Sequence, residues 1–139
     1  MSFRHIATSV SFILGVTGLA AGLLVASPTP TEAASLKGTW SGSGRMTINS
    51  KGSERVRCRV TYSRISGQKF SMRARCASGA GRLTQSGTLS RVAGNTFQGT
   101  VFNAKFNVTA SVYVTISGRQ QTVHINSAGG SGRFTLRRR

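Results

Sequence analysis

Acidic residues are almost absent from this sequence, and their scarcity excludes whole classes of enzyme. The chain has no aspartate, and from Ser35 onward Glu54 is its only glutamate and His124 its only histidine. Hydrolysis by paired carboxylates therefore lacks its groups, and a Ser-His-Asp triad cannot be assembled. We interpret Glu54 as a hairpin-edge residue beside Arg55, and His124 as an outward strand residue. We expect no enzymatic activity and no cofactor.

Cysteine is also scarce, since the chain has only Cys58 and Cys76. Their separation is not a CxxC redox motif, and with His124 as the only added ligand a metal site would be incomplete. We therefore predict no metal. An even cysteine count is most simply interpreted as a single structural disulfide, provided that the protein is exported to an oxidising compartment.

Basic residues, in contrast, are abundant. From Ser35 onward, 18 Lys and Arg side chains stand against one acidic side chain, which leaves a formal charge of +17. Val, Ile, Leu, Phe and Tyr recur at regular intervals, so this part is not a disordered basic tail. A folded domain with this excess of charge must attract anions.

The N-terminus has the three-part pattern of a secretory signal. A short segment with Arg4 and His5 precedes an apolar run, Ser11 to Ala26, and small residues follow up to Ala34. The apolar run is shorter than the roughly 20 residues needed to span a bilayer, although an uncleaved anchor is the alternative. We predict a removed signal peptide over residues 1–34 and one small domain over 35–139, periplasmic or extracellular, with no transmembrane span.

Hydrophobic periodicity predicts strands and no helix. In Lys105 to Ile116, residues at every second position from Phe106 and Val108 onward are apolar, which is typical of a half-buried strand. Eight strands are predicted, at Leu36 to Ile48, Arg55 to Ile65, Lys69 to Ala77, Gly81 to Val92, Thr96 to Phe102, Lys105 to Ile116, Gln120 to Asn126 and Arg133 to Arg137. Short links favour an all-β, eight-stranded antiparallel up-and-down barrel, which hides its edges. A two-sheet β-sandwich is the alternative.

The second and third predicted strands form a hairpin around Ser66-Gly67-Gln68. One register places Cys58 opposite Cys76, within disulfide reach, and a disulfide there would contribute about 3 kcal/mol. The same register places these apolar residues on the face of the cysteines: Val56, Val60, Tyr62, Phe70, Met72 and Ala74. A slip by one residue would destroy both features.

The other face of this hairpin is basic. It receives Arg55, Arg57, Arg59, Arg73 and Arg75, and the C-terminus adds Arg137, Arg138 and Arg139. The planar guanidinium fork suits phosphate and carboxylate. Solvation of surface charge is the simpler interpretation, but like charges placed opposite one another destabilise a sheet unless something offsets them. We therefore expect an anionic partner: lipid head groups, lipopolysaccharide or an acidic glycan. Nucleic acid is less favoured, because this face has no aromatic side chains on which bases could stack.

The segment Leu36-Lys37-Gly38-Thr39-Trp40 contains a G-x-W motif at the head of the first strand. With the strand pattern and a basic residue in the last strand, it resembles the calycin superfamily of small barrels, such as lipocalins and avidins. The resemblance implies that Trp40 closes one barrel end and that a late arginine, Arg133, packs over it. The L-x-G-x-W form, with one disulfide, is also similar to the bacterial periplasmic metalloprotease-inhibitor family.

These observations together predict a non-catalytic, exported binding or envelope-associated module. Its arginine-rich face would engage an anionic surface. The alternatives are a protease inhibitor of calycin type and a carrier of a small apolar ligand inside the barrel.

Overall fold

The computed structural model describes residues 22, 24 and 35–139. The predicted signal peptide, residues 1–34, thus lies outside the described residues except at two positions. Across the residues described, no helix is both long enough and apolar enough to cross a membrane.

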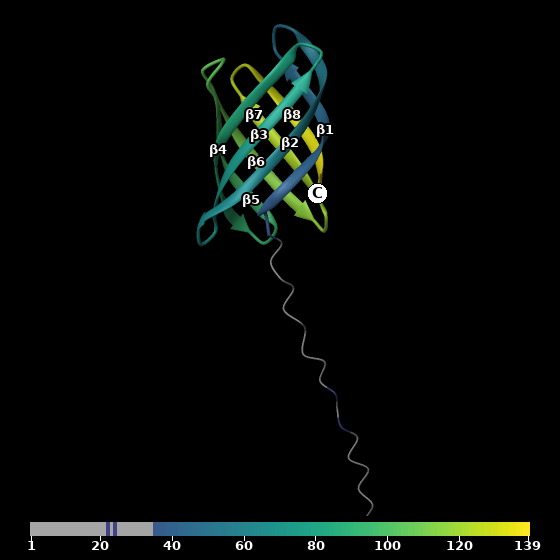
Figure 1. Ribbon diagram of the computed structural model, residues 1–139, viewed down its shortest axis with the longest axis vertical. Coiled ribbons are helices and arrows are strands. Elements are labelled where there is room, and N and C mark those ends of the chain that lie inside the picture. The colour runs from purple at the N-terminus through teal and green to yellow at the C-terminus, as the bar shows by residue number, and fades with distance from the viewer. Residues whose placement is uncertain (1–21, 23, 25–34) are drawn as a thin grey trace, which may run out of the picture. The chain divides into compact units, whose positions relative to one another are not determined.

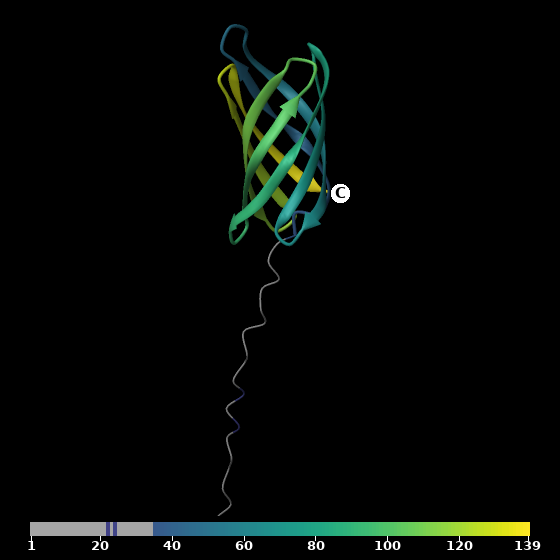
Figure 2. The same cartoon turned by 90° about the vertical axis from the view of Figure 1, so that its left-hand side faces the viewer.

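Eight antiparallel strands form a closed barrel in which each strand pairs with its neighbours in sequence and β8 pairs with β1. Figures 1 and 2 show the strands crossing the barrel axis obliquely around its whole circumference. The strands are β1 (Gly38–Ile48), β2 (Gly52–Ser66), β3 (Lys69–Ser78), β4 (Gly81–Ala93), β5 (Thr96–Asn103), β6 (Val108–Ser117), β7 (Gln120–Ser127) and β8 (Gly130–Arg138). The predicted eight-stranded up-and-down barrel is confirmed, and the sandwich alternative is wrong.

The strands follow the period-two pattern of the sequence, with alternate side chains inside the barrel and outside it. In β6, Ala110, Val112, Val114 and Ile116 are buried, as predicted. The pattern was wrong at the start of this strand, where Phe106 and Val108 are 59% and 41% exposed.

The reason is a turn over residues 104–107 that delays β6 until Val108. Asn107 adopts a φ of 51°, a left-handed conformation that asparagine tolerates better than most residues. The backbone N–H of Phe106 donates to Asn103 Oδ1 at 3.2 Å. The alternating pattern alone could not reveal this turn, because it contains no glycine or proline.

The predicted β2–β3 register is confirmed. Cys58 pairs with Cys76 in the strand register and is joined to it by a disulfide, with a Cα–Cα distance of 4.1 Å. The connecting turn is tighter than predicted, because Ser66 still pairs with Lys69 after a bulge. Gly67 has a φ of 44°, a left-handed backbone conformation that glycine adopts more easily than residues with a side chain.

The barrel has two different ends. The closed end contains the β2–β3, β4–β5 and β6–β7 turns and lies at the bottom of Figure 1. Four aromatic rings fill it and are almost inaccessible: Trp40, Tyr62, Phe70 and Phe97. The rings of Phe70 and Phe97 meet edge to face, with centroids 5.6 Å apart. The open end contains the other four turns, and it has no comparable cluster among the residues described.

Trp40 closes the barrel as the G-x-W motif implied, but the arginine over it is Arg138. The Arg138 guanidinium lies 4.3 Å from the Trp40 ring centroid, and the indole Nε1 donates to the Leu36 carbonyl at 3.1 Å. Arg133 is exposed on the outside of the barrel instead. The cause is strand alternation: Phe134 and Leu136 point inward, so Arg138 does too, whereas Arg133 and its odd-numbered neighbours point outward.

Candidate functional site

The outer surface of four adjacent strands, β8, β1, β2 and β3, together with the start of β4, is rich in arginine. We call this surface the arginine face. All of its arginines are exposed: Arg45, Arg55, Arg57, Arg59, Arg73, Arg75, Arg82, Arg133, Arg137 and Arg139. The structure brings together every predicted anion-binding residue except Arg138, which caps Trp40.

Three arginines of this face, Arg45, Arg82 and Arg133, were absent from the predicted anion-binding set. The outward direction of Arg45 could have been predicted from strand alternation, because Trp40 points inward and odd-numbered residues of β1 therefore point outward. Arg133 was predicted to lie at the barrel end, and the sequence pattern predicted no role for Arg82, which lies at the start of β4.

The arginines lie in rows that run across the strands. Arg137, Ser41, Arg59 and Arg75 form one row through successive register pairs. Arg133 pairs with Arg45, which pairs in turn with Arg55, to form another. Like charges directly opposite one another are destabilising. No carboxylate side chain among the described residues offsets them, because Glu54 turns into the barrel.

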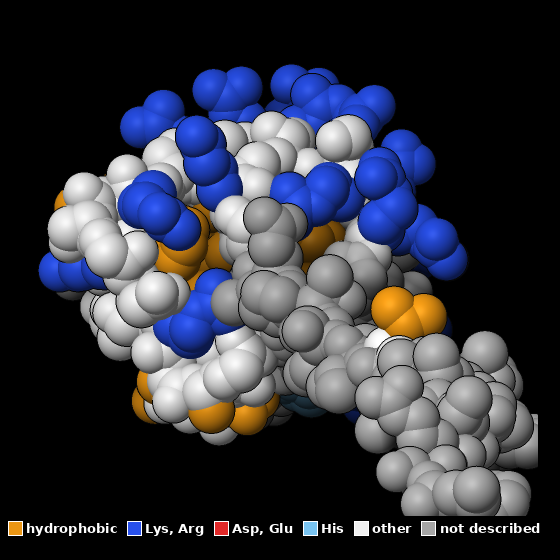
Figure 3. Space-filling view, turned by 90° about the horizontal axis from the view of Figure 1, so that it is seen from below, with side chains coloured by type: hydrophobic (Ala, Val, Ile, Leu, Met, Phe, Trp, Pro, Cys, Tyr) orange, Lys and Arg blue, Asp and Glu red, His pale blue; other side chains and the backbone are white. Residues whose placement is uncertain are grey.

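The outer surface of the strands on the opposite side of the barrel is uncharged. Strands β5, β6 and β7 contain no Lys, Arg, Asp or Glu. Their outward side chains are hydroxyls, amides, His124 and two exposed aromatics, Phe102 and Tyr113. Figure 3, which looks from the closed end, shows most Lys and Arg side chains along one side of the circumference and no Asp or Glu in view. The positive charge of the barrel is therefore one-sided.

A hollow of about 850 Å³ lies within the arginine face, over β1 to β4. Its outward floor consists of short side chains, Ser41, Ser43, Ala77 and Thr84. Five long basic side chains surround this floor: Arg57, Arg59, Arg75, Arg82 and Arg139. The hollow arises because long and short side chains alternate across neighbouring strands.

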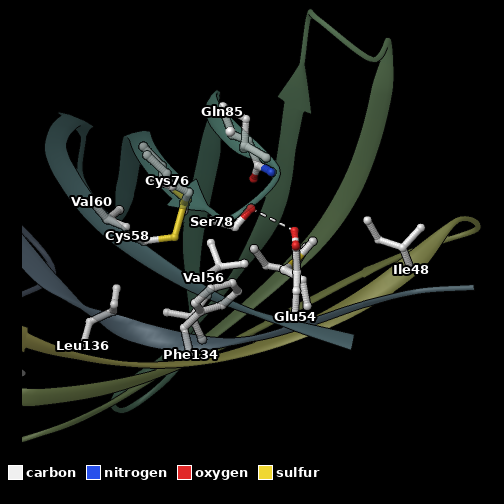
Figure 4. Close-up of a pocket in the computed structure, with 18 residues that line it drawn as sticks. Ile48, Glu54, Val56, Cys58, Val60, Cys76, Ser78, Gln85, Phe134 and Leu136 are labelled. Carbon is white, nitrogen blue, oxygen red and sulfur yellow. Dashed lines mark hydrogen bonds between the residues drawn. A yellow bond between two sulfur atoms is a disulfide. The ribbon is translucent and has the colours of Figure 1, made fainter. Parts of the chain in front are cut away.

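A second space, of about 60 Å³, lies inside the barrel toward the open end (Figure 4). Its walls are mostly apolar and include the disulfide, Val56 and Phe134. Three polar side chains also line it: Glu54, Ser78 and Gln85.

Glu54 was predicted to lie at the hairpin edge beside Arg55, and this interpretation was wrong. β2 begins at Gly52, three residues before the predicted start at Arg55. Glu54 lies an even number of residues from the buried Val56, so its carboxylate enters the barrel. The Ser78 hydroxyl donates to Glu54 Oε1 at 2.9 Å. Gln85 Oε1 is buried and has no hydrogen-bond donor among the residues described. The open end therefore presents unused acceptor capacity.

Side chains fill the barrel below this space. Tyr62 is 1% exposed, and burial raises its pKa above the usual value, so the phenol stays protonated. Its hydroxyl donates to Gln121 Oε1 at 2.8 Å. Within residues 22, 24 and 35–139, no group of three His, Cys, Asp or Glu side chains could hold a metal ion.

No family model and no curated protein matches this sequence. Among solved structures, the redesigned β-barrel mFAP1 bound to DFHBI is 20% identical, with a TM-score of 0.64, covering 74% of this chain and 94% of that one. The redesigned barrel mFAP0, also bound to DFHBI, is 20% identical with a TM-score of 0.62, covering 74% and 98%. A fluorescence-activating β-barrel designed de novo is 16% identical with a TM-score of 0.61, covering 77% and 96%. At these identities the likeness is one of fold alone.

Proposed function

We propose that this protein is a non-catalytic binding module whose arginine face attaches to an anionic surface outside the cytoplasm. One observation carries the proposal: exposed arginines gather on β8 and β1 to β4, while β5, β6 and β7 carry no charged residue. A protein that needed charge only for solubility would gain as much from arginines spread around the barrel. A one-sided distribution orients the molecule toward a charged surface.

The repulsion within the face supports the same proposal. Arg59 lies directly opposite Arg75, and Arg45 lies between Arg55 and Arg133. Such pairs lower stability unless an anion neutralises them. Attachment to a surface that presents many negative groups would convert this repulsion into attraction.

The partner we favour is an anionic lipid head group, lipopolysaccharide or acidic glycan. Proteins that bind single-stranded nucleic acid combine basic grooves with aromatic platforms. The outward positions of the arginine face contain no aromatic side chain, and the exposed rings of Phe102 and Tyr113 belong to β5 and β6. The disulfide is compatible with the predicted export.

The proposal is tested by co-sedimentation with vesicles of anionic and of zwitterionic phospholipid. We expect retention on the anionic vesicles alone. It should weaken steeply as salt rises from about 0.01 M to about 1 M, because the screening length falls from about 30 Å to about 3 Å. Binding that is absent, or that does not depend on salt, would contradict the proposal.

A matched pair of triple variants separates the face from net charge. Arg57→Gln/Arg59→Gln/Arg73→Gln removes three charges from the arginine face. Lys51→Gln/Lys105→Gln/Arg119→Gln removes three exposed charges from turns at the barrel ends, none of which is an outward position of the arginine face. We expect the first variant to lose most of its vesicle binding and the second to lose little. Equal losses would mean that charge acts without regard to position.

The open-end cavity supports a second candidate function, the binding of a small molecule. The buried, unpaired Gln85 Oε1 carries this proposal, because a buried acceptor without a donor is costly. A ligand with a small apolar body and an N–H or O–H donor would satisfy Gln85. Two barrels of similar fold are described as bound to DFHBI. Native mass spectrometry should then reveal a co-purifying molecule that is lost in Gln85→Leu, and an unliganded native mass would argue against carriage.

Membership of the calycin superfamily stays a prediction, supported by Trp40 and Arg138 at one barrel end. Protease inhibition also stays a prediction. It would require that a metalloprotease lose its activity at a near-stoichiometric ratio of this protein.

A further inference from the structure

We propose that the hollow in the arginine face is a specific site for a molecule that carries two phosphate groups. This inference rests on the proposed function and narrows the anionic partner to a bisphosphorylated head group. The hollow, rather than the face as a whole, would provide the specificity.

The first phosphate position lies over Arg59 and Arg75. These residues are directly opposite in the β2–β3 register, where Cβ atoms are about 4.5–5.5 Å apart. Both side chains point outward and both line the hollow. Two guanidinium forks that start this close together can approach one phosphate from two sides.

The second position lies over Ala77. In the neighbouring row, Ala77 pairs with Arg57 on one side and with Arg82 on the other. The two arginines are thus separated by two strand spacings, about 9.6 Å. The methyl group of Ala77 leaves the space between them empty, and a phosphate seated there would contact both guanidinium groups.

The two rows fix the separation of the phosphates. Arg57 and Arg59, like Arg75 and Ala77, are two residues apart on one strand, and this corresponds to about 6.6 Å. Arg139 follows β8 directly and also lines the hollow, and its backbone N–H donates to the Thr39 carbonyl at 2.9 Å. Phosphates on opposite carbons of a six-membered ring match such a spacing better than a diphosphate, whose phosphorus atoms share one oxygen.

Charge and hydrogen bonding favour phosphate over a carboxylate or a sulfate. Each phosphate monoester carries a charge of about −1.5 to −2 at neutral pH, so two of them match the five arginines far better than single negative charges do. The hydroxyls of Ser41, Ser43 and Thr84 at the floor could donate to phosphate oxygens as well.

The test is calorimetric titration of the full chain with inositol 1,4-bisphosphate and with inositol 1-phosphate. We expect the bisphosphate to bind at least about tenfold more tightly, a difference that each added charge-assisted pair can supply. Equal affinities would overturn the two-phosphate site. Binding is also compared between vesicles with a bisphosphorylated lipid and vesicles of equal charge made from a monophosphorylated lipid. Tighter binding to the bisphosphorylated vesicles would indicate a membrane lipid as the source of the two phosphates, and equal binding would indicate a free molecule.

Two variants test the position of the site. Arg59→Gln/Arg75→Gln should lower bisphosphate affinity about tenfold or more. Arg45→Gln/Arg133→Gln removes the same charge from the same face outside the hollow and should change the affinity by less than about threefold. Ala77→Leu fills the space between Arg57 and Arg82 without altering charge and should also abolish the preference for the bisphosphate.

These outcomes separate the inference from the proposed function. Equal effects of the two double variants, or an unchanged preference in Ala77→Leu, would overturn the hollow site while salt-dependent vesicle binding still supported the arginine face. Failure of the unmodified protein to bind anionic vesicles would remove the proposed function itself. Circular dichroism of each variant checks that the barrel is folded, and Ala77→Leu serves if a double variant does not fold.

Discussion

The closed and open ends of the barrel are built from the same eight strands but in opposite ways. At the closed end, Trp40 is fully buried, and its indole N–H has an acceptor in the Leu36 carbonyl. At the open end, Ile48 is 37% exposed, and Gln85 retains a buried oxygen without a donor among the described residues. Close packing of aromatic rings stabilises the first end, where Gln121 Nε2 is also buried without an acceptor among the described residues, whereas the second end retains free volume. The closed end is therefore the more tightly packed of the two, and the open end contains the space in which we propose that a small molecule binds.

Arginine has a different role in each region. Arg64, Arg91 and Arg138 lie over the rings of Phe70, Phe97 and Trp40. These contacts combine cation–π attraction with coverage of apolar surface. On the outer face, arginines such as Arg59 and Arg75 have no aromatic partner of this kind among the residues described. Arginine count alone therefore says little about binding, and strand parity decides which role a residue has.

The largest expected effect is the loss of the closed-end ring. Trp40→Ala should lower the free energy of unfolding by about 3–5 kcal/mol, because it leaves a cavity in the buried aromatic cluster. Ile48→Ala at the open end should cost less than about 1 kcal/mol, since its side chain is already partly solvated. Urea unfolding followed by far-UV circular dichroism measures both. Similar losses for the two variants would break the contrast between the ends.

An intermediate effect is expected for the arginine over Trp40. Arg138 also donates to the Lys37 carbonyl at 2.7 Å and to the Ser35 carbonyl. Arg138→Gln should therefore cost about 1–2 kcal/mol in unfolding free energy. Arg137→Gln, the same change one residue earlier on the outer face, should stay within about 0.5 kcal/mol. A larger loss for Arg137 than for Arg138 would reverse the assignment.

The smallest effect is expected at the β5–β6 turn of the open end. Phe106 is 59% exposed, so Phe106→Ser should change the unfolding free energy by less than about 0.5 kcal/mol. The control is Phe97→Ser, which removes a fully buried ring from the closed end. Both are measured by the same urea unfolding. If Phe106→Ser cost several kcal/mol, Phe106 would belong to the core, as the alternating sequence had predicted.

The sequence was sufficient to predict the strand order, because the links between strands are short, and the β2–β3 register, because alternate residues of a strand face opposite sides of the sheet. A single register satisfied Cys58, Cys76 and the division of the hairpin into apolar and basic faces at once. The alternation of residues along β8 also predicts that Arg138 points inward, because it lies two and four residues after the inward-facing Leu136 and Phe134. The alternation therefore indicated Arg138, but the resemblance to the calycin superfamily led to the prediction of Arg133.

Other features depended on information that no periodic pattern contains. The hollow requires the pairing of β1 with β2 and of β3 with β4, because its floor and its rim come from four strands. The turn at residues 104–107 depends on Asn107 adopting a positive φ. The space beside Glu54 depends on how far Met46, Leu83 and Ile125 extend into the barrel. The hollow and the internal space arise from tertiary packing, and the turn arises from a local backbone conformation.

The disulfide has a consequence for the order in which the barrel can be completed. Cys58 and Cys76 lie on neighbouring strands, so both halves of their hairpin exist once the chain has reached Ser78. The β1–β8 seam joins residues about as far apart as the domain allows, and Arg138 donates to a carbonyl 101 positions earlier. A chain that emerges with its N-terminus first can therefore form the disulfide of its hairpin early. It can close the barrel only when β8 is available to pair with β1.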